Sequence, residues 1–174
     1  MVPIEGINSI DILSRIVINK IQNEYIYEST AKPKKGDVIF CRRAISLYKH
    51  FCIYIGRGKV IHFAAKDGEA DPEEAVIHET TLKRFANGDK VYVMNFPEEY
   101  HAGSKLRELA MKDGYCLQSP EETVARAKSK LGLRGVKDEG YSFFMNNCED
   151  FAIWCKTNVC ESRQLNSYID AVLP

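Results

Sequence analysis

The fold is decided by residues 50–64, which read HFCIYIGRGKVIHFA. Two runs rich in β-branched and aromatic residues flank two closely spaced glycines, a pattern typical of a β-hairpin. A three-residue loop would pair Cys52 with His62 and place His50 diagonally beside them on the same face of the sheet. Two imidazoles and a thiol would then converge. A two-residue loop would instead send His62 to the opposite face, so the convergence depends on the turn.

Further strands are expected on both sides of this hairpin. Residues 38–41, 75–79 and 90–96 are apolar or alternating, and residues 140–144 form another extended apolar piece. With turn and loop residues between these segments, we expect an antiparallel or mixed sheet.

Apolar periodicity and capping residues predict three helices within residues 1–131. Ser9 precedes apolar residues spaced by three and four, which predicts an amphipathic helix to about Glu24 that packs on the domain. Thr80 can cap a short helix through Phe85. Ser119 opens a capping box with proline at the first helical position, which predicts a helix over residues 120–131.

Composition limits the class of protein. The chain has 174 residues, 45% of them hydrophobic and 28% charged, so one globular domain is expected. Its 24 basic and 24 acidic residues give a net charge of 0, and we expect no nucleic-acid partner. No apolar run approaches the roughly 20 residues that cross a bilayer, and no signal-peptide core is present, so a cytoplasmic location is expected.

The six cysteines predict neither disulfides nor a metal site. They are scattered and lack a secretory context or any usual zinc spacing, so reduced thiols, no metal and no cofactor are expected. Most are interpreted as small buried hydrophobes: Cys41, Cys52, Cys116, Cys155 and Cys160. His78 and His101 match no motif and are expected at the surface.

Cys148 stands apart because a helix is expected to begin beside it. Asn146 and Asn147 are good N-cap residues, and the apolar spacing of residues 151–155 continues a helix. Backbone N–H groups and the helix dipole at such a position favour the thiolate and lower the cysteine pKa. A thiolate of this kind is a nucleophile for covalent acyl transfer, provided that a histidine is supplied from elsewhere in the fold.

These residues together resemble a known family. The stretch KHFCIYIG (49–56), the later His62 and the triplet Asn147-Cys148-Glu149 are similar to the H-box and NC motif of the lecithin:retinol acyltransferase-like (LRAT-like) proteins. That family is a circularly permuted branch of the NlpC/P60 papain-like thiol hydrolases. The resemblance implies an α+β fold, with an antiparallel β-sheet packed against helices in a single domain.

The resemblance also implies a reaction and roles for individual residues. Cys148 would be the nucleophile, His50 the base, and His62 the group that orients His50. Oxyanion stabilisation would fall to backbone N–H groups and a neighbouring polar side chain, for which Arg43, Tyr54 and Asn147 are candidates. The implied activity is that of a phospholipase A1/A2 or acyltransferase that forms a thioester from a phospholipid or another acyl donor.

The chain departs from many animal members of the family. Those members have histidine after Asn-Cys-Glu, whereas this chain has Asp150, like plant NC-domain proteins. The substrate therefore stays open, as does the balance between hydrolase and transferase. A binding or regulatory module without catalysis, and a cysteine amidase or peptidase, are the alternative functions.

The expected organisation has three parts. A helical extension (1–30) precedes an LRAT-like catalytic domain (31–160), and a short polar tail (161–174) follows it. The tail does not predict a stable membrane anchor, although peripheral membrane contact is compatible with a lipid substrate. The sequence leaves the oligomeric state open.

Overall fold

The computed structural model describes residues 27–43, 49–66, 73–96, 114–140 and 147–159. The helix expected over residues 9–24 lies outside these ranges, as do residues 141–144 of the expected extended piece, Asn146, His101 and Cys160. The division into an extension, a domain and a tail therefore stays a prediction.

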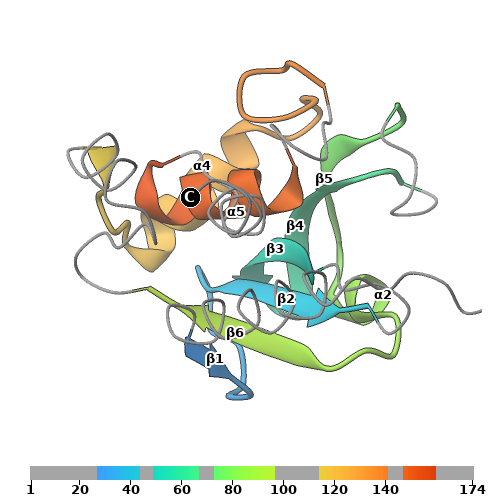
Figure 1. Cartoon of the computed structure of the whole chain (residues 1–174), viewed down its shortest axis with the longest axis vertical. Helices are drawn as coiled ribbons and strands as arrows, with labels where there is room; N and C mark the ends of the chain where they lie inside the picture. Colours follow the sequence, from blue (N-terminus) through green and yellow to red (C-terminus); the bar gives the residue numbers. More distant parts are fainter. Residues whose placement is uncertain (1–26, 44–48, 67–72, 97–113, 141–146, 160–174) are drawn as a thin grey trace, which may run out of the picture.

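The described chain is built on one six-stranded sheet (Figure 1). The strand order is β1-β6-β2-β3-β4-β5, and each described pairing between neighbouring strands is antiparallel. This confirms the α+β class with an antiparallel sheet. The strands are β1 Tyr27–Ser29, β2 Val38–Arg42, β3 Lys49–Gly56, β4 Lys59–Ala64, β5 Val76–Thr81 and β6 Val91–Asn95.

Within the described residues, three helices accompany the sheet: α2 (Leu82–Ala86), α4 (Pro120–Ser129) and α5 (Cys148–Thr157). The Ser119 side chain accepts a hydrogen bond from the Glu122 amide, which confirms the predicted start of α4. Helix α2 is capped by Thr81, one residue later than expected. No helix in the described part of the chain is long and apolar enough to span a bilayer.

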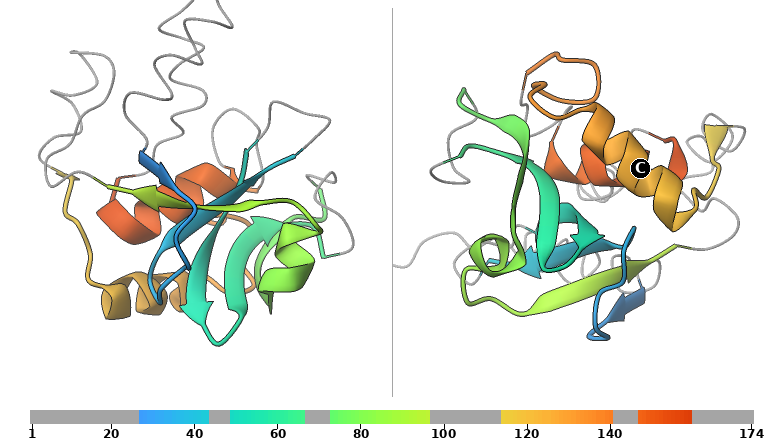
Figure 2. Two further views of the ribbon diagram at one scale, coloured as in Figure 1. Left: turned by 90° about the horizontal axis from the view of Figure 1, so that it is seen from below. Right: turned by 180° about the vertical axis from the view of Figure 1, so that it is seen from behind.

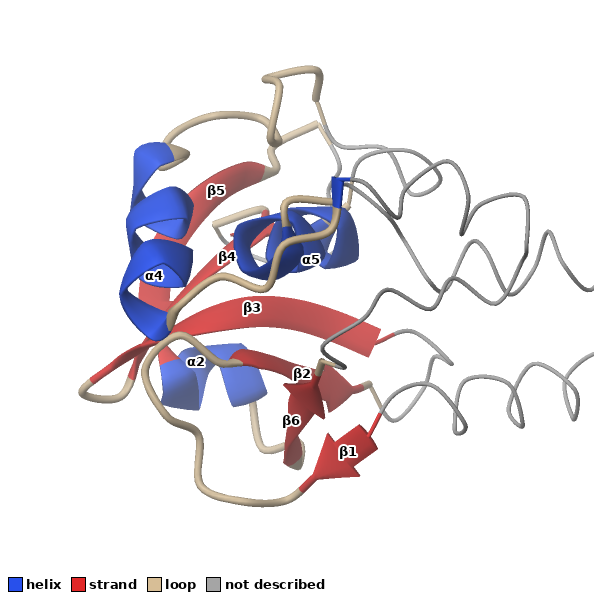
Figure 3. Ribbon diagram, turned by 90° about the vertical axis from the view of Figure 1, so that its left-hand side faces the viewer, coloured by secondary structure: helices blue, strands red, loops and turns tan. Residues whose placement is uncertain are grey.

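Side-chain alternation in the strands separates two packing layers. Phe51, Ile53 and Ile61 belong to a large buried cluster that also contains residues of α4 and α5. The intervening positions, such as Cys52 and Val60, join a smaller cluster with Phe85 of α2. Helices α4 and α5 therefore cover one face of the sheet and α2 covers the other, as the turned views show (Figures 2 and 3).

The β3–β4 hairpin reaches its predicted register by a different turn. The loop is only Arg57 and Gly58, both with positive φ, and Gly56 pairs with Lys59. A bulge follows between Tyr54 and Gly56, and beyond it the pairing of Cys52 with His62 is as predicted. The extra residue in the bulge offsets the shorter loop, so His62 stays on the predicted face.

Gly36 fixes the approach of the turn before β2 to helix α4. Its φ is +84°, and a Cβ built there would lie 2.4 Å from the Cα of Pro120. Its amide also donates to the Tyr54 carbonyl at 2.8 Å, which ties the turn to β3. Only glycine combines this backbone conformation with so close a contact.

Candidate active site

A row of three histidines crosses β3, β4 and β5. His50 Nε2 lies 2.9 Å from His62 Nδ1, and His62 Nε2 lies 3.0 Å from His78 Nε2. His62 and His78 are direct partners across β4 and β5, whereas His50 is diagonal to His62. The structure thus brings together the two histidines expected from the sequence and adds a third.

The expectation that His78 is a surface residue is wrong. The residue is half-buried, and its Nδ1 lies 3.0 Å from the Val76 carbonyl oxygen. No local motif marks it. Pairing β5 with β4 in the observed register is the step that would have revealed it, because that register sets His78 opposite His62.

Burial holds His50 and His62 in their neutral forms. Their exposed fractions are 1% and 5%. Burial, and then the nearby His62, Arg43 and His78, keeps the pKa of His50 well below its ordinary value of 6.5. Burial, followed by His78 and two arginines, lowers the pKa of His62 to about 3. Both imidazoles are therefore uncharged near neutral pH, as a general base must be before it accepts a proton.

Phe85 of α2 covers the first two histidines. Its ring centroid lies 5.2 Å from that of His50 and 5.7 Å from that of His62. The aromatic ring excludes water from this side of the pair and so contributes to its desolvation.

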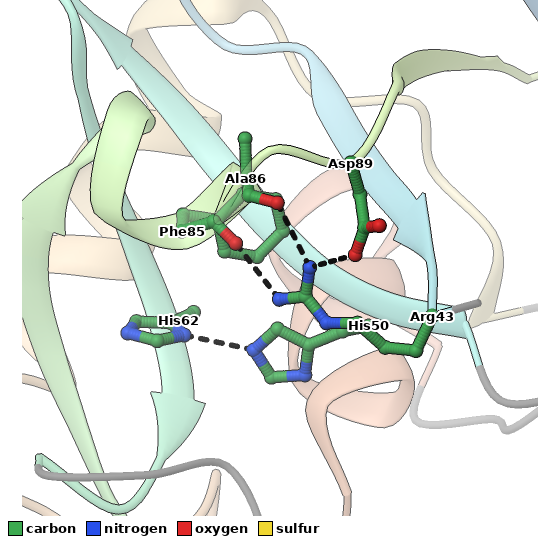
Figure 4. Close-up of polar contacts among 6 residues, drawn as sticks. All are labelled: Arg43, His50, His62, Phe85, Ala86 and Asp89. Carbon is green, nitrogen blue, oxygen red and sulfur yellow. Dashed lines mark hydrogen bonds and ion pairs between the residues drawn. The ribbon is translucent and has the colours of Figure 1, made fainter. Parts of the chain in front are cut away.

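Arg43 holds α2 over the histidines through hydrogen bonds (Figure 4). Its guanidinium donates to the carbonyls of Phe85 and Ala86 at 2.8 and 3.1 Å and to the Asp89 carboxylate at 2.7 Å. These carbonyls end the helix, where a cation is favoured by the helix dipole. The observed role of Arg43 is therefore to hold the element that carries Phe85.

Tyr54 lies away from the histidine row. It is four residues from His50 along β3, which is about 13 Å in an extended strand. Its hydroxyl accepts a hydrogen bond from the Gly58 amide at 3.1 Å, at the turn. We therefore leave this expected oxyanion candidate out of the proposed site.

Cys148 is the first residue of α5, as the sequence predicts, and it is completely buried. Asn147 caps the helix: its side-chain oxygen accepts from the amides of Glu149 and Asp150 at 2.8 and 3.2 Å. The Asp150 carboxylate accepts from the Asn147 amide at 3.0 Å, which completes a capping box. Asp150 thus has a structural role in this chain, as the capping-box partner of Asn147.

Helix α5 carries Cys148 onto the sheet. The helix packs against β3, and Cys148 belongs to the large buried cluster with Phe51, whereas the His50 ring contacts Phe85 of the smaller cluster. Among the described cysteines, Cys41, Cys52 and Cys155 are also buried, as predicted. Cys116 is exposed, so its interpretation as a buried hydrophobe is wrong.

Metal ligation finds no support in the described part of the chain. No group of three or more His, Cys, Asp and Glu side chains there is arranged to hold a metal ion. The three histidines instead contact one another in pairs along a row. Their nitrogens are therefore used in hydrogen bonds that suit proton transfer and orientation.

Several known proteins are similar to this chain over most of its length. Protein LEAD-SENSITIVE 1 of Arabidopsis thaliana is 29% identical in an alignment that covers 84% of this chain and 66% of that protein. The chain thus spans just under two thirds of that relative. Human Phospholipase A and acyltransferase 3 is 27% identical over 141 residues, 80% of each chain. Human Phospholipase A and acyltransferase 2 is 27% identical over 142 residues, 81% of each chain.

The family follows from a sequence match that includes His50, His62 and Cys148. Residues 31–161 match the family described as lecithin retinol acyltransferase, which is well over half of the chain. Names of phospholipase and acyltransferase among the relatives agree with an enzyme family. The chain belongs to the lecithin retinol acyltransferase (LRAT) family.

Proposed function

We propose that the protein is a thiol-dependent acyltransferase or phospholipase A1/A2 that takes a fatty acyl group from a glycerophospholipid onto Cys148. The observation that carries this proposal is the buried His50–His62 pair, 2.9 Å apart, on two strands against which α5 packs. That Cys148, at the start of α5, reaches His50 is part of the proposal. The names of the human relatives favour a phospholipid as the acyl donor.

His50 is the proposed base, and its Nδ1 atom receives the proton. Its other ring nitrogen, Nε2, is hydrogen-bonded to His62, which orients the ring. The start of α5 supports the thiolate, because the helix dipole and backbone N–H groups stabilise negative charge there. Asn147 acts in this proposal as the helix cap that fixes the nucleophile, since its side-chain oxygen accepts two backbone hydrogen bonds.

Acyl transfer then proceeds in two steps. The Cys148 Sγ loses its proton to His50 and attacks the ester carbonyl carbon. The bond from that carbon to the glycerol oxygen breaks, and the oxygen takes the proton from His50 as the lysophospholipid leaves. Water or an amine next gives a proton to His50 and attacks the thioester carbon. The sulfur leaves and recovers the proton, which yields a free fatty acid or an acyl amide.

Intact-mass measurement after incubation with phosphatidylcholine vesicles tests the nucleophile. We expect wild-type protein to gain the mass of one acyl group minus a hydrogen, and Cys148→Ala to gain nothing and to lose lipid turnover. Cys116→Ala is the matched control, because it removes an exposed thiol and leaves the site intact. Equal lipid turnover by wild type and Cys148→Ala would falsify the proposed mechanism.

The two alternative functions give different results in the same assay. Thiol-dependent cleavage of acyl amides or peptides without lipid turnover would identify an amidase or peptidase. Slow alkylation of Cys148 by iodoacetamide near neutral pH, with no turnover of any ester or amide, would identify a binding module.

The proposal also includes the location of the protein and its contact with membranes. A cytoplasmic protein that contacts membranes only peripherally suits a lipid substrate. Sedimentation with phosphatidylcholine vesicles measures this contact. Release of the bound protein by dilution is the expected result, and retention after repeated washing would contradict it.

A further inference from the structure

We infer that His78 is a positioning residue that fixes the tautomers of His62 and His50, so that His50 presents an unprotonated Nδ1 to the nucleophile. The hydrogen bonds that would fix these tautomers are present in the protein without substrate. Its catalytic consequence rests on the proposed function of His50 as the base.

The argument starts at the Val76 carbonyl, which can only accept a hydrogen bond. His78 Nδ1, 3.0 Å from that oxygen, must therefore carry a proton and donate. In neutral His78 the other nitrogen, Nε2, then has no proton and acts as an acceptor. A backbone atom of β5 thus determines the tautomer of a side chain on the same strand.

The same logic passes along the row. His62 Nε2 lies 3.0 Å from the accepting Nε2 of His78, so His62 carries its proton on Nε2. Its Nδ1 is then the acceptor for His50 Nε2 at 2.9 Å, and His50 carries its proton on Nε2. The remaining nitrogen of neutral His50, Nδ1, holds a lone pair that can take a proton.

Burial strengthens the hydrogen bonds between these histidines and keeps each donor with a single acceptor. His50 and His62 are 1% and 5% exposed, so neither nitrogen can readily exchange its partner for bulk water. The lowered pKa values of His50 and His62 agree with neutral rings, each with one proton. Without an acceptor at His78, the two tautomers of His62 would differ little in energy, and His50 would lose its preference.

Long-range ¹H–¹⁵N NMR of the imidazoles tests the inference directly, since it separates protonated from unprotonated ring nitrogens. The chain has only four histidines, which keeps the spectrum simple. In wild-type protein near neutral pH we expect an unprotonated Nδ1 in His50 and His62 and a protonated Nδ1 in His78. A protonated Nδ1 in His50 would overturn the inference.

Two variants separate the acceptor from the rest of the side chain. His78→Leu removes the acceptor, and we expect His50 and His62 to show mixed tautomers. His78→Gln offers an amide oxygen at a similar reach, and we expect it to restore the wild-type tautomers. Unchanged tautomers in folded His78→Leu would also overturn the inference. If that variant does not fold, the wild-type spectrum still decides.

Kinetics supply the second readout. With phosphatidylcholine as substrate, His78→Leu is expected to lower kcat about fivefold at unchanged KM, and His78→Gln to recover most of it, as expected for one hydrogen bond. Wild-type kcat in His78→Leu would count against the positioning role. If wild type had no lipid turnover at all, the proposed function would fail while the NMR result still tested the tautomers.

Discussion

Acidification is expected to destabilise the fold through the buried histidines His50 and His62. Both are neutral in the folded protein because burial lowers their pKa values. In the unfolded chain each takes up a proton below about pH 6.5. The unfolded state therefore binds more protons, and stability falls as the pH drops from about 6.5 toward the folded-state values.

The magnitude for His62 follows from its folded-state pKa of about 3, compared with an ordinary value of 6.5. At about pH 5 the solution is about 1.5 units below the ordinary value, and each unit corresponds to about 1.36 kcal/mol. His62 alone should thus lower the free energy of unfolding by about 2 kcal/mol between about pH 7.5 and pH 5. His50 contributes in the same direction.

Urea unfolding monitored by the fluorescence of Trp154, the one tryptophan, measures this change. His62→Gln is the matched control, because it removes one titrating ring and leaves every carboxylate in place. The loss of stability on acidification should be about 2 kcal/mol smaller in this variant than in wild type. Equal losses in the two proteins would refute the reasoning. NMR titration offers a second check, in which folded His62 should stay neutral at about pH 5.

Three further predictions concern stability and thiol reactivity. Asn147→Ala should lower the free energy of unfolding by about 1 kcal/mol because the α5 cap is lost, whereas Asn147→Asp should keep most of the stability of wild type. Equal urea midpoints for wild type and both variants would contradict the stabilising role of the cap. Gly36→Ala should lower the free energy of unfolding several times more than Gly58→Ala, because a Cβ at residue 36 would meet the backbone of α4, whereas one at residue 58 would meet open space. Similar losses for the two variants in urea unfolding would argue against the contact with α4. Peptide mapping after iodoacetamide treatment of folded protein should find Cys116 modified and Cys155 unmodified, because Cys155 is buried and burial raises its pKa. Labelling of Cys155 as early as that of Cys116 would contradict this prediction.

Local patterns were sufficient for strands β2 to β6 and for the start of α5, but not for β1. Strand propensity and two glycines predicted the hairpin, and the pairing of Cys52 with His62 is confirmed. Asn147 was predicted as a cap, and the structure shows its side chain on two backbone amides. These features depend on neighbours within a few residues, which is the range over which capping and turn chemistry act.

Contacts between distant segments could not be predicted in the same way. The position of His78 requires the register of β5 on β4, and no tight turn specifies it, because β4 ends at Ala64 and β5 begins only at Val76. The three hydrogen bonds of Arg43 require the placement of α2 beside the end of β2, more than 40 residues away in sequence. Such partners are fixed by tertiary packing.

The bulge at Tyr54–Gly56 has a consequence for how the chain could vary. Inserting or deleting one residue at the β3–β4 tip, with the bulge unchanged, would shift the register of β4 by one residue and exchange its inward and outward side chains. His62 would then leave His50, although the change lies at the opposite end of β3. The loop and the bulge are therefore constrained together, because a residue lost from one has to be restored in the other to keep His62 on its face of the sheet.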